Sequence, residues 1–474
     1  MNTSAVMTID EALQATGGSL IRGAAEKIFR GVSTDSRTLQ EGNLFVCLRG
    51  ENFDGHRFLS AAATAAGFVI QKDAGEGIIA AQEQRPVIVV ADTLSALGDI
   101  ARCWRKKFNV PVIAVTGSSG KTTTKEMTAQ ILGDGKNVLK TEGNFNNRVG
   151  LPLTLLRFTG RHDVAVVEMG TNLPGEIECL TRIAEPDIGL ITNIGAAHLE
   201  KLKSLGGIRE EKGALFASMN RDGIAVINRD DREVETLARR WQGKRITFGW
   251  KRGADISAHD VRRTDPAGIA FQLRTGQARR QVHMQIAGIH HLYNALGAAA
   301  ASLAFGENLD RICRGLESFR GVPGRFDVQT LKNGAYVIDD TYNANPLSVR
   351  EALKALHELR GGADSAVILG DMLELGARAG QWHRKIGRLI AETGVQSLVL
   401  LGDHRRDTAT GAMERGMTAS RIFFCEGPEQ ARDYLKRSLK PGDWVLVKGS
   451  RKMKMERIIG IMIETFGLQE RAVQ

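Results

Sequence analysis

The chain has 474 residues, of which 42% are hydrophobic and 25% are charged. These values are typical of a soluble globular enzyme with about two to four domains. The formal net charge of +10 would suit a nucleic-acid partner, but lysine and arginine are interspersed with acids and aromatic residues make up only 5% of the chain. There is no basic tail and no RNA-stacking motif. We therefore expect no nucleic-acid partner, and a multiply charged acidic small molecule explains the positive charge better.

Targeting and metal-binding signals are absent from the sequence. The stretch Met1–Gln14 has no apolar core and carries acids early, so we expect no secretory signal. The alanine-rich run Ala295–Phe305 is too short to span a bilayer. The five cysteines are scattered, without CxxC pairs or clusters with histidine, which argues for reduced thiols and against a zinc site. We expect a cytoplasmic protein without membrane insertion, and nothing requires more than a monomer.

In chain order, the first hundred residues mix short strands (NLFVCLRG, GFVIQK, PVIVVAD) with helical patterns. Strands and helices then alternate as AVTG, KTTTKEMTAQIL, DVAVVEMG and DIGLITNIG. This alternation predicts a parallel, doubly wound sheet whose ligand lies at the carboxyl ends of the strands. Between Arg245 and Ile286, the segments RITFG, IAFQLRT and QVHMQIAG predict an antiparallel ribbon, and a helix follows from about His291.

The clearest hinge candidate is RGVPGRFD, around Gly321, Pro323 and Gly324. Beyond it the alternation restarts with AYVIDDT, a helix after Pro346, and the strands SAVILGD, SLVLLGD, RIFFCE and DWVLVKGS. The chain is therefore predicted to be α/β with three domains. These are a small N-terminal α/β module (1–104), a central P-loop-type, doubly wound domain (105–321) and a C-terminal Rossmann-like domain (322–474).

The segment Pro111–Glu126, PVIAVTGSSGKTTTKE, carries the strongest chemical signal. A buried strand, a glycine-rich turn, and a lysine with threonines at the start of a helix together form a cradle for phosphates. Val115 stands where the Walker A consensus has its first glycine, but this order of residues disfavours an ordinary strand–turn–helix. The residues expected to bind the phosphates of ATP are Thr116, Gly117, Ser118, Ser119, Gly120, Lys121, Thr122 and Thr123.

Three further groups follow the loop in the sequence. Glu168 ends a predicted strand, where a carboxylate can hold the Mg²⁺ that bridges nucleotide phosphates. His198 follows ITNIGAAH and could bind a metal or phosphate, although a structural histidine is equally compatible with the sequence. Lys212, beside Glu210 and Glu211, reads by itself as part of a solvated charged face.

The order of these motifs resembles that of the Mur ligases, the ATP-dependent amide-forming enzymes of peptidoglycan precursor synthesis. The resemblance rests on TGSSGKTTTKE, TEGNFNNRVGLPLTLL, VVEMG, ITNIGAAHLE and EEKGALF, and it covers nearly the whole chain. The Val115 departure is also how the loop of that family looks.

Motifs at the two ends of the chain are similar to those of particular members. VSTDSR and ENFDGHRFL resemble the UDP-sugar-binding module of the enzymes that add the third residue and the final dipeptide. IDDTYNANPLS and LGDMLELG resemble the dipeptide-adding enzyme alone, and the DYAHTPD-like and DNPR-like stretches of the third-residue enzyme are absent.

The resemblance implies a two-step reaction of the EC 6.3.2 class. ATP would phosphorylate the terminal carboxylate of UDP-N-acetylmuramoyl-tripeptide, and the amine of D-alanyl-D-alanine would attack the acyl phosphate. It implies that Lys121 screens the β- and γ-phosphates and that Thr122 and Glu168 hold a first Mg²⁺. His198 would hold a second Mg²⁺, and Lys212 would be carbamylated, which turns an ammonium repelled by Mg²⁺ into an anionic ligand. The implied catalytic residues are Lys121, His198 and Lys212.

The remaining site residues are carried over from the family's motifs. On the nucleotide these are His290, Asn294, Arg325 and Asp340. His291 is left out because relatives usually carry asparagine there. Because Arg325 and Asp340 lie beyond the hinge, the resemblance implies a site completed by domain closure. The UDP-muramoyl-peptide residues are Ser33, Asp35, Ser36, Arg37, Asp54, Gly55, His56, Thr141, Asn144, Asn146 and Asn147. The dipeptide residues are Tyr342, Asn343, Asn345, Lys448, Ser450 and Arg451.

Two other functions remain open at this stage. A folylpolyglutamate synthase would share the ATP domain and the acyl-phosphate chemistry, but it lacks the module that FDGH and STDSR indicate. A non-catalytic nucleotide-binding regulator would not need Glu168, His198 and Lys212 beside the loop. The sequence leaves open whether the third residue of the tripeptide is meso-diaminopimelate or lysine, and which other dipeptides or depsipeptides are accepted.

Overall fold

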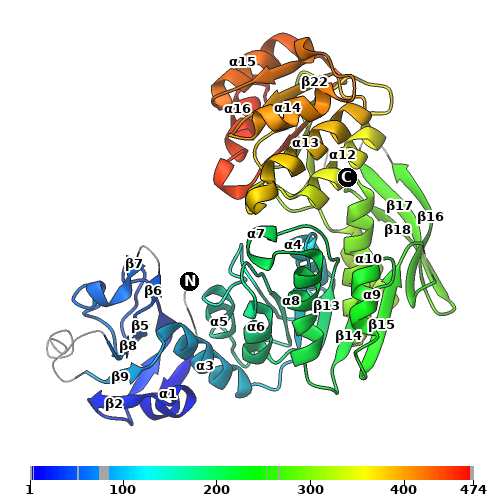
Figure 1. The fold of residues 1–474 in the computed structure, drawn as a ribbon. Coiled ribbons are helices and arrows are strands. Elements are labelled where there is room, and N and C mark those ends of the chain that lie inside the picture. Colours follow the sequence, from blue (N-terminus) through cyan, green and yellow to red (C-terminus); the bar gives the residue numbers. More distant parts are fainter. Residues whose placement is uncertain are drawn as a thin grey trace.

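The computed structural model describes residues 3, 5–50, 53–73, 85–251, 253–264 and 267–469. It has three α/β regions, which follow one another from blue through green to red (Figure 1). Their main sheets have five, nine and six strands. The predicted fold class is therefore confirmed. Glu51 and Asn52, the first two residues of the ENFDGHRFL motif, lie outside the described residues.

The N-terminal domain is built on a sheet in the order β2-β9-β8-β5-β4. Strands β4, β5, β8 and β9 are parallel, and β2 pairs with β9 in the antiparallel direction. The three strands predicted here are present as β5, β8 and β9. The elements are β1 (Val6–Thr8), α1 (Ile9–Thr16), β2 (Ser19–Arg22), β3 (Ile28–Arg30), β4 (Val32–Ser33), β5 (Leu44–Val46), β6 (Arg49–Gly50), β7 (Phe53–Asp54), β8 (Gly67–Gln71), β9 (Val87–Val90) and α3 (Thr93–Lys106).

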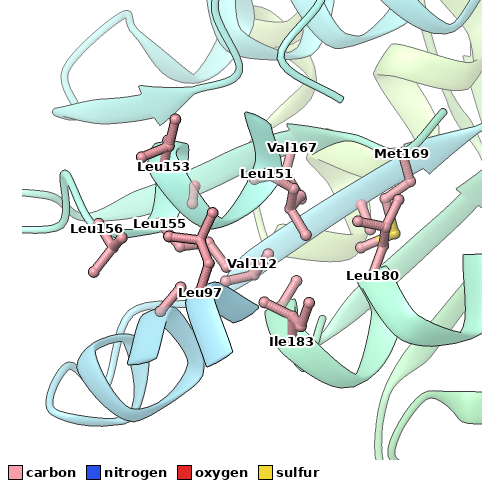
Figure 2. Close-up of a cluster of buried hydrophobic side chains, with 14 of the residues drawn as sticks. Leu97, Val112, Leu151, Leu153, Leu155, Leu156, Val167, Met169, Leu180 and Ile183 are labelled. Atoms are coloured by element: carbon pink, nitrogen blue, oxygen red, sulfur yellow. The ribbon is translucent and has the colours of Figure 1, made fainter. Parts of the chain in front are cut away.

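Helix α3 connects this domain to the central one. Asp92 caps its first turn by accepting hydrogen bonds from the backbone N–H groups of Leu94 and Ser95. Leu97 of α3 packs among apolar side chains of the central domain, including Leu155 and Ile183 (Figure 2). The boundary predicted between residues 104 and 105 thus falls within a helix whose side chains belong to a core shared with the central domain.

The central sheet has the order β11-β12-β10-β13-β14-β15-β16-β17-β18. Neighbouring strands pair in parallel from β11 to β16. Strand β17 pairs in the antiparallel direction with both β16 and β18. Its strands are β10 (Val112–Thr116), β11 (Val138–Lys140), β12 (Val164–Glu168), β13 (Ile188–Ile191), β14 (Ile224–Asn228), β15 (Lys244–Gly249), β16 (Ile256–Thr264), β17 (Gly268–Thr275) and β18 (Ala278–Met284). Its helices are α4 (Lys121–Leu132), α5 (Gly150–Leu155), α6 (Glu176–Ala184), α7 (Leu199–Leu202), α8 (Leu205–Ser218), α9 (Arg232–Ala238), α10 (Ile289–Phe305) and α11 (Leu309–Glu317).

The prediction of an antiparallel ribbon was correct for two of its three segments. IAFQLRT and QVHMQIAG form β17 and β18, but RITFG forms β15, which pairs in parallel with β14. The partner of β17 on its other side is β16, a strand that the sequence analysis did not distinguish. The prediction was wrong for RITFG because the ribbon continues the main sheet without a break, so the alternating pattern begins before the strand direction changes.

Both faces of the central sheet are covered, which explains its continuous apolar strands. Successive residues of β10 point to opposite faces. Val112 belongs to the cluster beneath α3, α5 and α6, where it is drawn between Leu97 and Ile183 (Figure 2). Ile113 and its neighbours on that face pack instead with α4, α10 and α11. The carboxyl ends of the strands therefore emerge between two rigid helical layers.

The C-terminal sheet has the order β19-β20-β24-β21-β22-β23 and is parallel except for the edge strand β19. All the strands predicted after the hinge are present. In the predicted hinge, Gly321 and Gly324 have φ values of 94° and 72°, which few residues other than glycine adopt. The elements are β19 (Asp327–Thr330), β20 (Tyr336–Asp340), α12 (Pro346–Arg360), β21 (Ser365–Leu369), α13 (Ala379–Glu392), β22 (Ser397–Leu400), α14 (Arg405–Met413), β23 (Ile422–Phe424), α15 (Pro428–Ser438), β24 (Trp444–Lys448) and α16 (Glu456–Phe466).

Among the described residues, no helix is both long and apolar enough to cross a membrane.

Candidate active site

A cleft of about 910 Å³ lies between the central and C-terminal domains. One wall is formed by the segments that follow β10, β12, β13 and β14, so it is the carboxyl edge of the central sheet. The other wall is formed by the segments after β20 and β24 and by the first turns of α12. Ligands of doubly wound sheets bind at this edge, which makes the cleft the candidate active site.

The phosphate loop lies on the central wall. A Cβ atom at Gly117, where φ is 150°, would come within 1.9 Å of the Thr192 hydroxyl, so the tight turn requires glycine. Helix α4 begins at Lys121, and its N-terminal N–H groups present partial positive charge to the cleft. Ser118, Ser119, Gly120, Lys121, Thr122 and Thr123 line the cleft. Thr116 and Gly117 do not line it.

Lys121 is folded onto its own loop, where its Nζ donates a hydrogen bond to the Gly117 carbonyl at 2.9 Å. Burial lowers the pKa of Lys121, and Arg325 lowers it further, while the carboxylate of Glu168 acts in the opposite direction. A bound phosphate would stabilise the charged form of this side chain. The loop is also held by Asn193, whose amide accepts from the Ser119 N–H and donates to the Ser119 carbonyl.

Glu168 ends β12 and is 2% exposed. Its Oε1 accepts a hydrogen bond from Asn146 Nδ2 at 2.7 Å, but its buried Oε2 has no partner among the described residues. A buried carboxylate oxygen without a partner is costly unless a ligand satisfies it. Within the described part of the chain, no three His, Cys, Asp or Glu side chains are grouped to hold a metal ion. Glu168 and the Thr122 hydroxyl therefore fit a Mg²⁺ whose other ligands come from phosphates and water.

His198 caps the short helix α7 in a left-handed conformation, with φ of 53°. Its Nδ1 lies 2.5 Å from Oε2 of Glu374 in the C-terminal domain. This hydrogen bond lowers the pKa of Glu374. Both residues line the cleft. The sequence analysis quoted the LGDMLELG motif but did not single out Glu374, and the polar break in its apolar run was the available signal.

The prediction from sequence alone of a solvated charged face around Lys212 is wrong for two of its three residues. Glu211 and Lys212 are 6% and 1% exposed, whereas Glu210 is exposed. Glu211 accepts hydrogen bonds from the backbone N–H groups of Gly175 and Ile177, so it caps the start of α6. Burial, reinforced by the charge of Lys121, holds the pKa of Lys212 well below its usual value. Lys212 itself does not line the cleft.

Arg325 connects the C-terminal domain to the phosphate loop. Its Nη2 donates a hydrogen bond to the Thr122 hydroxyl at 3.0 Å. Its guanidinium carbon lies 3.7 Å from the centre of the Tyr342 ring, a cation–π contact that holds the side chain in place. Arg325 thus lies beside the phosphate loop, and its contact with ATP stays a prediction.

Asp340 and Lys448 form a buried ion pair, with 2.6 Å between Oδ2 and Nζ, and Lys448 also donates to the Asn343 carbonyl at 2.9 Å. Burial raises the pKa of Asp340 and lowers that of Lys448, and the charge of each group opposes the shift of the other. A ribose at Asp340 or a substrate carboxylate at Lys448 would have to share this pair.

The other candidate dipeptide residues lie around the same wall. Asn345 caps α12 by accepting a hydrogen bond from the Ser348 N–H, and Ser450 accepts one from the Leu373 N–H at 2.8 Å. Arg451 is exposed and pairs with Glu456. The cleft brings together all six candidates, namely Tyr342, Asn343, Asn345, Lys448, Ser450 and Arg451.

His290 and Asn294, on the first turns of α10, also line the cleft. Burial lowers the pKa of His290 to about 3, and its Nδ1 has no hydrogen-bond partner among the described residues. Asn294 lies directly behind Gly120, where a Cβ atom would come within 2.2 Å of the Asn294 amide oxygen.

The candidate muramoyl-peptide residues divide into two groups. Asn144, Asn146 and Asn147 line the cleft, and Thr141 accepts a hydrogen bond from the Glu168 N–H just behind it. The candidate UDP residues do not line the cleft and lie in the N-terminal domain: Ser33, Asp35, Ser36, Arg37, Asp54, Gly55 and His56.

The candidate UDP loops meet at one edge of the N-terminal sheet. Ser33 ends β4, and the Gln71 N–H, at the end of the parallel strand β8, donates to His56 Nε2 at 3.0 Å. His56 Nδ1 lies 2.6 Å from Asp54. In the neighbouring loop, the Arg37 side chain donates hydrogen bonds to Asp35 and lowers its pKa to about 2. The carboxyl edge of this sheet thus carries a second polar surface, separate from the cleft.

The site has the features of a nucleotide-dependent enzyme. It combines a phosphate loop and its lysine with a buried carboxylate oxygen that has no partner among the described residues, and a second domain faces both. Residues 28–105 match the catalytic domain of the Mur ligase family, residues 115–302 the Mur ligase middle domain, and residues 324–451 the glutamate ligase domain of Mur ligases. A UDP-N-acetylmuramoyl-tripeptide–D-alanyl-D-alanine ligase of Bacillus subtilis (strain 168) is 33% identical over 459 residues, which cover 97% of the chain and 98% of that protein. The chain belongs to the Mur ligase family.

Solved structures agree with this assignment. A crystal structure of MurF from Acinetobacter baumannii superposes with a TM-score of 0.88 at 32% identity, covering 98% of this chain and all of that one. MurF ligase from Thermotoga maritima, crystallised in complex with ADP, superposes with a TM-score of 0.81 at 28% identity. That superposition covers 91% of this chain and 97% of the Thermotoga chain.

Proposed function

We propose that this protein is an ATP-dependent ligase that joins D-alanyl-D-alanine to UDP-N-acetylmuramoyl-tripeptide in peptidoglycan synthesis. The products are UDP-N-acetylmuramoyl-pentapeptide, ADP and phosphate. The observation that carries the proposal is the shared cleft, in which the phosphate loop faces the Tyr342–Asn345 segment and Lys448. The relatives reported above are named for this reaction.

The chemistry needs two substrates in one cleft and charge neutralisation between them. A terminal carboxylate oxygen of the peptide attacks the γ-phosphorus of ATP, and ADP leaves. The amine nitrogen of the dipeptide then attacks the acyl carbon, loses a proton, and phosphate leaves with the carboxylate oxygen. Lys121 and Arg325 would neutralise the phosphate oxygens, which the contact of Arg325 with Thr122 on the phosphate loop supports, and the two facing walls would hold the reactants in position.

Magnesium would be held by Thr122 and Glu168 at a first position and by His198 at a second. Bound at these positions, Mg²⁺ would screen the charges of the phosphates and of the acceptor carboxylate. The unpartnered Oε2 of Glu168 supports the first position. Lys212 would be carbamylated, because the neutral amine favoured by its low pKa is the form that captures CO₂. The resulting anion would orient the metal and its ligands.

We assign substrate roles to the three domains in the same way. The loops at the carboxyl edge of the N-terminal sheet would bind the uridine diphosphate within residues 1–104, and Thr141 and the Asn144–Asn147 loop would meet the muramoyl-peptide. The central domain (105–321) would bind ATP with His290 and Asn294 at the base, and the C-terminal domain (322–474) would bind the dipeptide. We further propose a monomer acting in the cytoplasm, where such nucleotide-linked precursors are used.

The test is phosphate release with ATP, Mg²⁺, UDP-N-acetylmuramoyl-tripeptide and D-alanyl-D-alanine, omitting each component in turn. Tripeptides ending in meso-diaminopimelate and in lysine are compared. Release that needs every component, with a pentapeptide product by mass spectrometry, is the expected result. Release without either peptide would indicate a plain ATPase or a regulator. No release with the peptides, but release with a folate and glutamate, would replace the proposal by a folylpolyglutamate synthase.

A further inference from the structure

The His198–Glu374 pair is a contact between two domains at a residue proposed to hold magnesium. His198 belongs to the segment after β13, and Glu374 belongs to the segment after β21, 176 residues further on. The two side-chain atoms lie 2.5 Å apart, and the His198 side chain is only 18% exposed. The Glu374 side chain is 52% exposed, so the pair is a short hydrogen bond that is shielded from solvent mainly on the His198 side.

The backbone around the pair is interlocked as well. The Glu200 N–H donates to the Glu374 carbonyl at 3.1 Å, and a Cβ atom at Gly376 would come within 3.3 Å of Glu200 Cα. His198 and Glu374 have φ values of 53° and 63°, a conformation that costs free energy for residues other than glycine. Such conformations persist only where the surroundings hold them, and they concentrate at functional sites.

The hydrogen bond decides which ring nitrogen of His198 can bind a ligand. A carboxylate that accepts from Nδ1–H fixes the tautomer and leaves Nε2 with a free lone pair. Metal-binding histidines commonly need such a partner on the other nitrogen, and its loss weakens metal binding. Of the described residues, Glu374 is the one whose side chain pairs with the His198 ring.

We propose that Glu374 is a positioning residue that orients His198 for a divalent cation, so that this part of the site forms only when the C-terminal domain is docked. The inference rests on the proposed function of His198 and adds the residue that prepares it. Arg325 provides a parallel, because it reaches from the same domain to the Thr122 hydroxyl. The C-terminal domain thus contacts both proposed cation positions of the central domain. The Glu374 carboxylate lies at His198, and the Arg325 guanidinium lies at Thr122.

The test measures Mn²⁺ binding by electron paramagnetic resonance, with a non-hydrolysable ATP analogue and UDP-N-acetylmuramoyl-tripeptide present. Glu374→Asn tolerates the left-handed backbone but is too short to reach His198, whereas Glu374→Gln keeps the length and an acceptor oxygen. We expect Glu374→Asn to weaken the second Mn²⁺ by about tenfold to a hundredfold and Glu374→Gln to weaken it less. The Mn²⁺ concentration for half-maximal activity should rise in step, while kcat at saturating Mn²⁺ largely recovers.

Two controls separate positioning from other roles. Glu351→Gln changes another acid of the same wall, which pairs with Arg350 and Lys354 of its own helix, and it should bind Mn²⁺ as the wild type does. In a double-mutant cycle, Glu374→Asn should add little to His198→Ala, because it acts through that ring.

Wild-type Mn²⁺ affinity in Glu374→Asn, or an undiminished effect of this substitution in the His198→Ala background, would overturn the inference alone. Wild-type affinity in His198→Ala would overturn the proposed role of His198 together with the inference. If Glu374→Asn unfolds at a lower temperature than the wild type, the double-mutant cycle is run with Glu374→Gln instead. The same outcomes in that cycle then decide the inference.

Discussion

The two walls of the cleft are built in different ways. The central wall is local, because a run of eight residues from Thr116 to Thr123 forms the loop, and Glu168, which accepts a hydrogen bond from Asn146, ends the neighbouring strand. The C-terminal wall is assembled from segments around residues 325, 340–345, 374 and 448–451. Its side chains reach the central wall only through long-range contacts such as Arg325 to Thr122.

This difference gives the two walls different proposed tasks: the central wall binds the phosphates, and the C-terminal wall completes the site around them. On the proposed function, the central wall would hold phosphates by itself, since its loop, helix terminus and lysine are fixed by one sheet. The C-terminal wall adds groups whose position depends on how the domain docks. Substitutions on the central wall should therefore lower kcat/KM by the largest factors, and those on the C-terminal wall should lower it by smaller factors.

Lys121→Ala should have the largest effect, because no other lysine lies on the phosphate loop. We expect kcat/KM to fall by about a hundredfold to a thousandfold, as for the loss of one preorganised group that stabilises transition-state charge. The measurement is phosphate release with all substrates. Lys136→Ala, beyond the far end of α4 where the lysine packs on Phe305, should retain wild-type activity. Equal losses in the two variants would mean that the loop is not the phosphate site.

Lys212→Ala should have the second-largest effect, with a fall in kcat/KM on the order of a hundredfold. Because the proposed role is that of a carbamate anion, acetate or propionate should restore part of the activity of this variant and none of the activity of Lys121→Ala. Full activity of Lys212→Ala without added acid would contradict the proposal. Mass spectrometry of the intact protein under CO₂ would detect the added group directly.

The loop could be predicted from sequence because its residues are contiguous and each has a local physical reason. The helix KTTTKEMTAQIL begins and ends where its residues predict, and Glu168 follows four apolar strand residues. Lys212 could not be placed in this way, since the burial of Glu211 and Lys212 depends on α6 packing against α8. Two charged residues on a helix do not by themselves predict that a neighbouring helix will bury them.

The C-terminal wall shows the same limit more clearly. The family resemblance implied that Asp340 and Lys448 face the site, but it did not indicate their mutual ion pair, which arises from the parallel pairing of β20 with β24. Glu374 meets His198 only through the docking of two loops. Contacts between distant segments carry no local pattern, so they remain the part that needs a structure.

Arg325→Ala tests the docked wall itself. Loss of a charged hydrogen bond costs about 1.5–3 kcal/mol, so kcat/KM should fall by roughly tenfold to a hundredfold, less than for Lys121→Ala. Arg325→Lys should restore little, because an ammonium cannot both stack on Tyr342 and reach Thr122 as a planar guanidinium does. A loss as large as that of Lys121→Ala would erase the distinction between the walls.

His290 makes the docking measurable through pH. Phe326, in the hinge segment, packs edge-on against the His290 ring with 4.8 Å between the ring centroids, and burial lowers the pKa of His290 from 6.5 to about 3. Because the folded pKa lies below the unfolded one, the unfolded chain binds the proton first as pH falls below 6.5. Stability from the neutral ring is therefore complete above pH 6.5 and is lost as the pH falls toward 3.

Between pH 6.5 and 5.5, the wild type should lose about 1 kcal/mol of unfolding free energy more than His290→Gln does. Chemical unfolding of both proteins at the two pH values gives this difference. Identical losses would show that His290 is not held neutral, and hence that the hinge segment does not cover it.

Tyr342 should give the smallest effect. A cation–π contact is worth about 0.5–1 kcal/mol at an accessible site, so Tyr342→Leu should lower kcat/KM by roughly twofold to fivefold through Arg325. Tyr342→Phe keeps the ring, and any rise in the KM for D-alanyl-D-alanine in this variant would report a contact of the hydroxyl with the dipeptide. If the kinetics of Tyr342→Leu are identical to those of the wild type, the Tyr342 ring is not needed to hold Arg325 in place.

The most direct test of the central claim, that ATP activates the peptide carboxylate in this cleft, follows the carboxylate oxygen. UDP-N-acetylmuramoyl-tripeptide labelled with ¹⁸O in its terminal carboxylate is turned over with ATP and D-alanyl-D-alanine, and the released phosphate is analysed by mass spectrometry. The account predicts one ¹⁸O atom in each phosphate, because the acyl phosphate leaves with a carboxylate oxygen. Unlabelled phosphate alongside a pentapeptide product would contradict it.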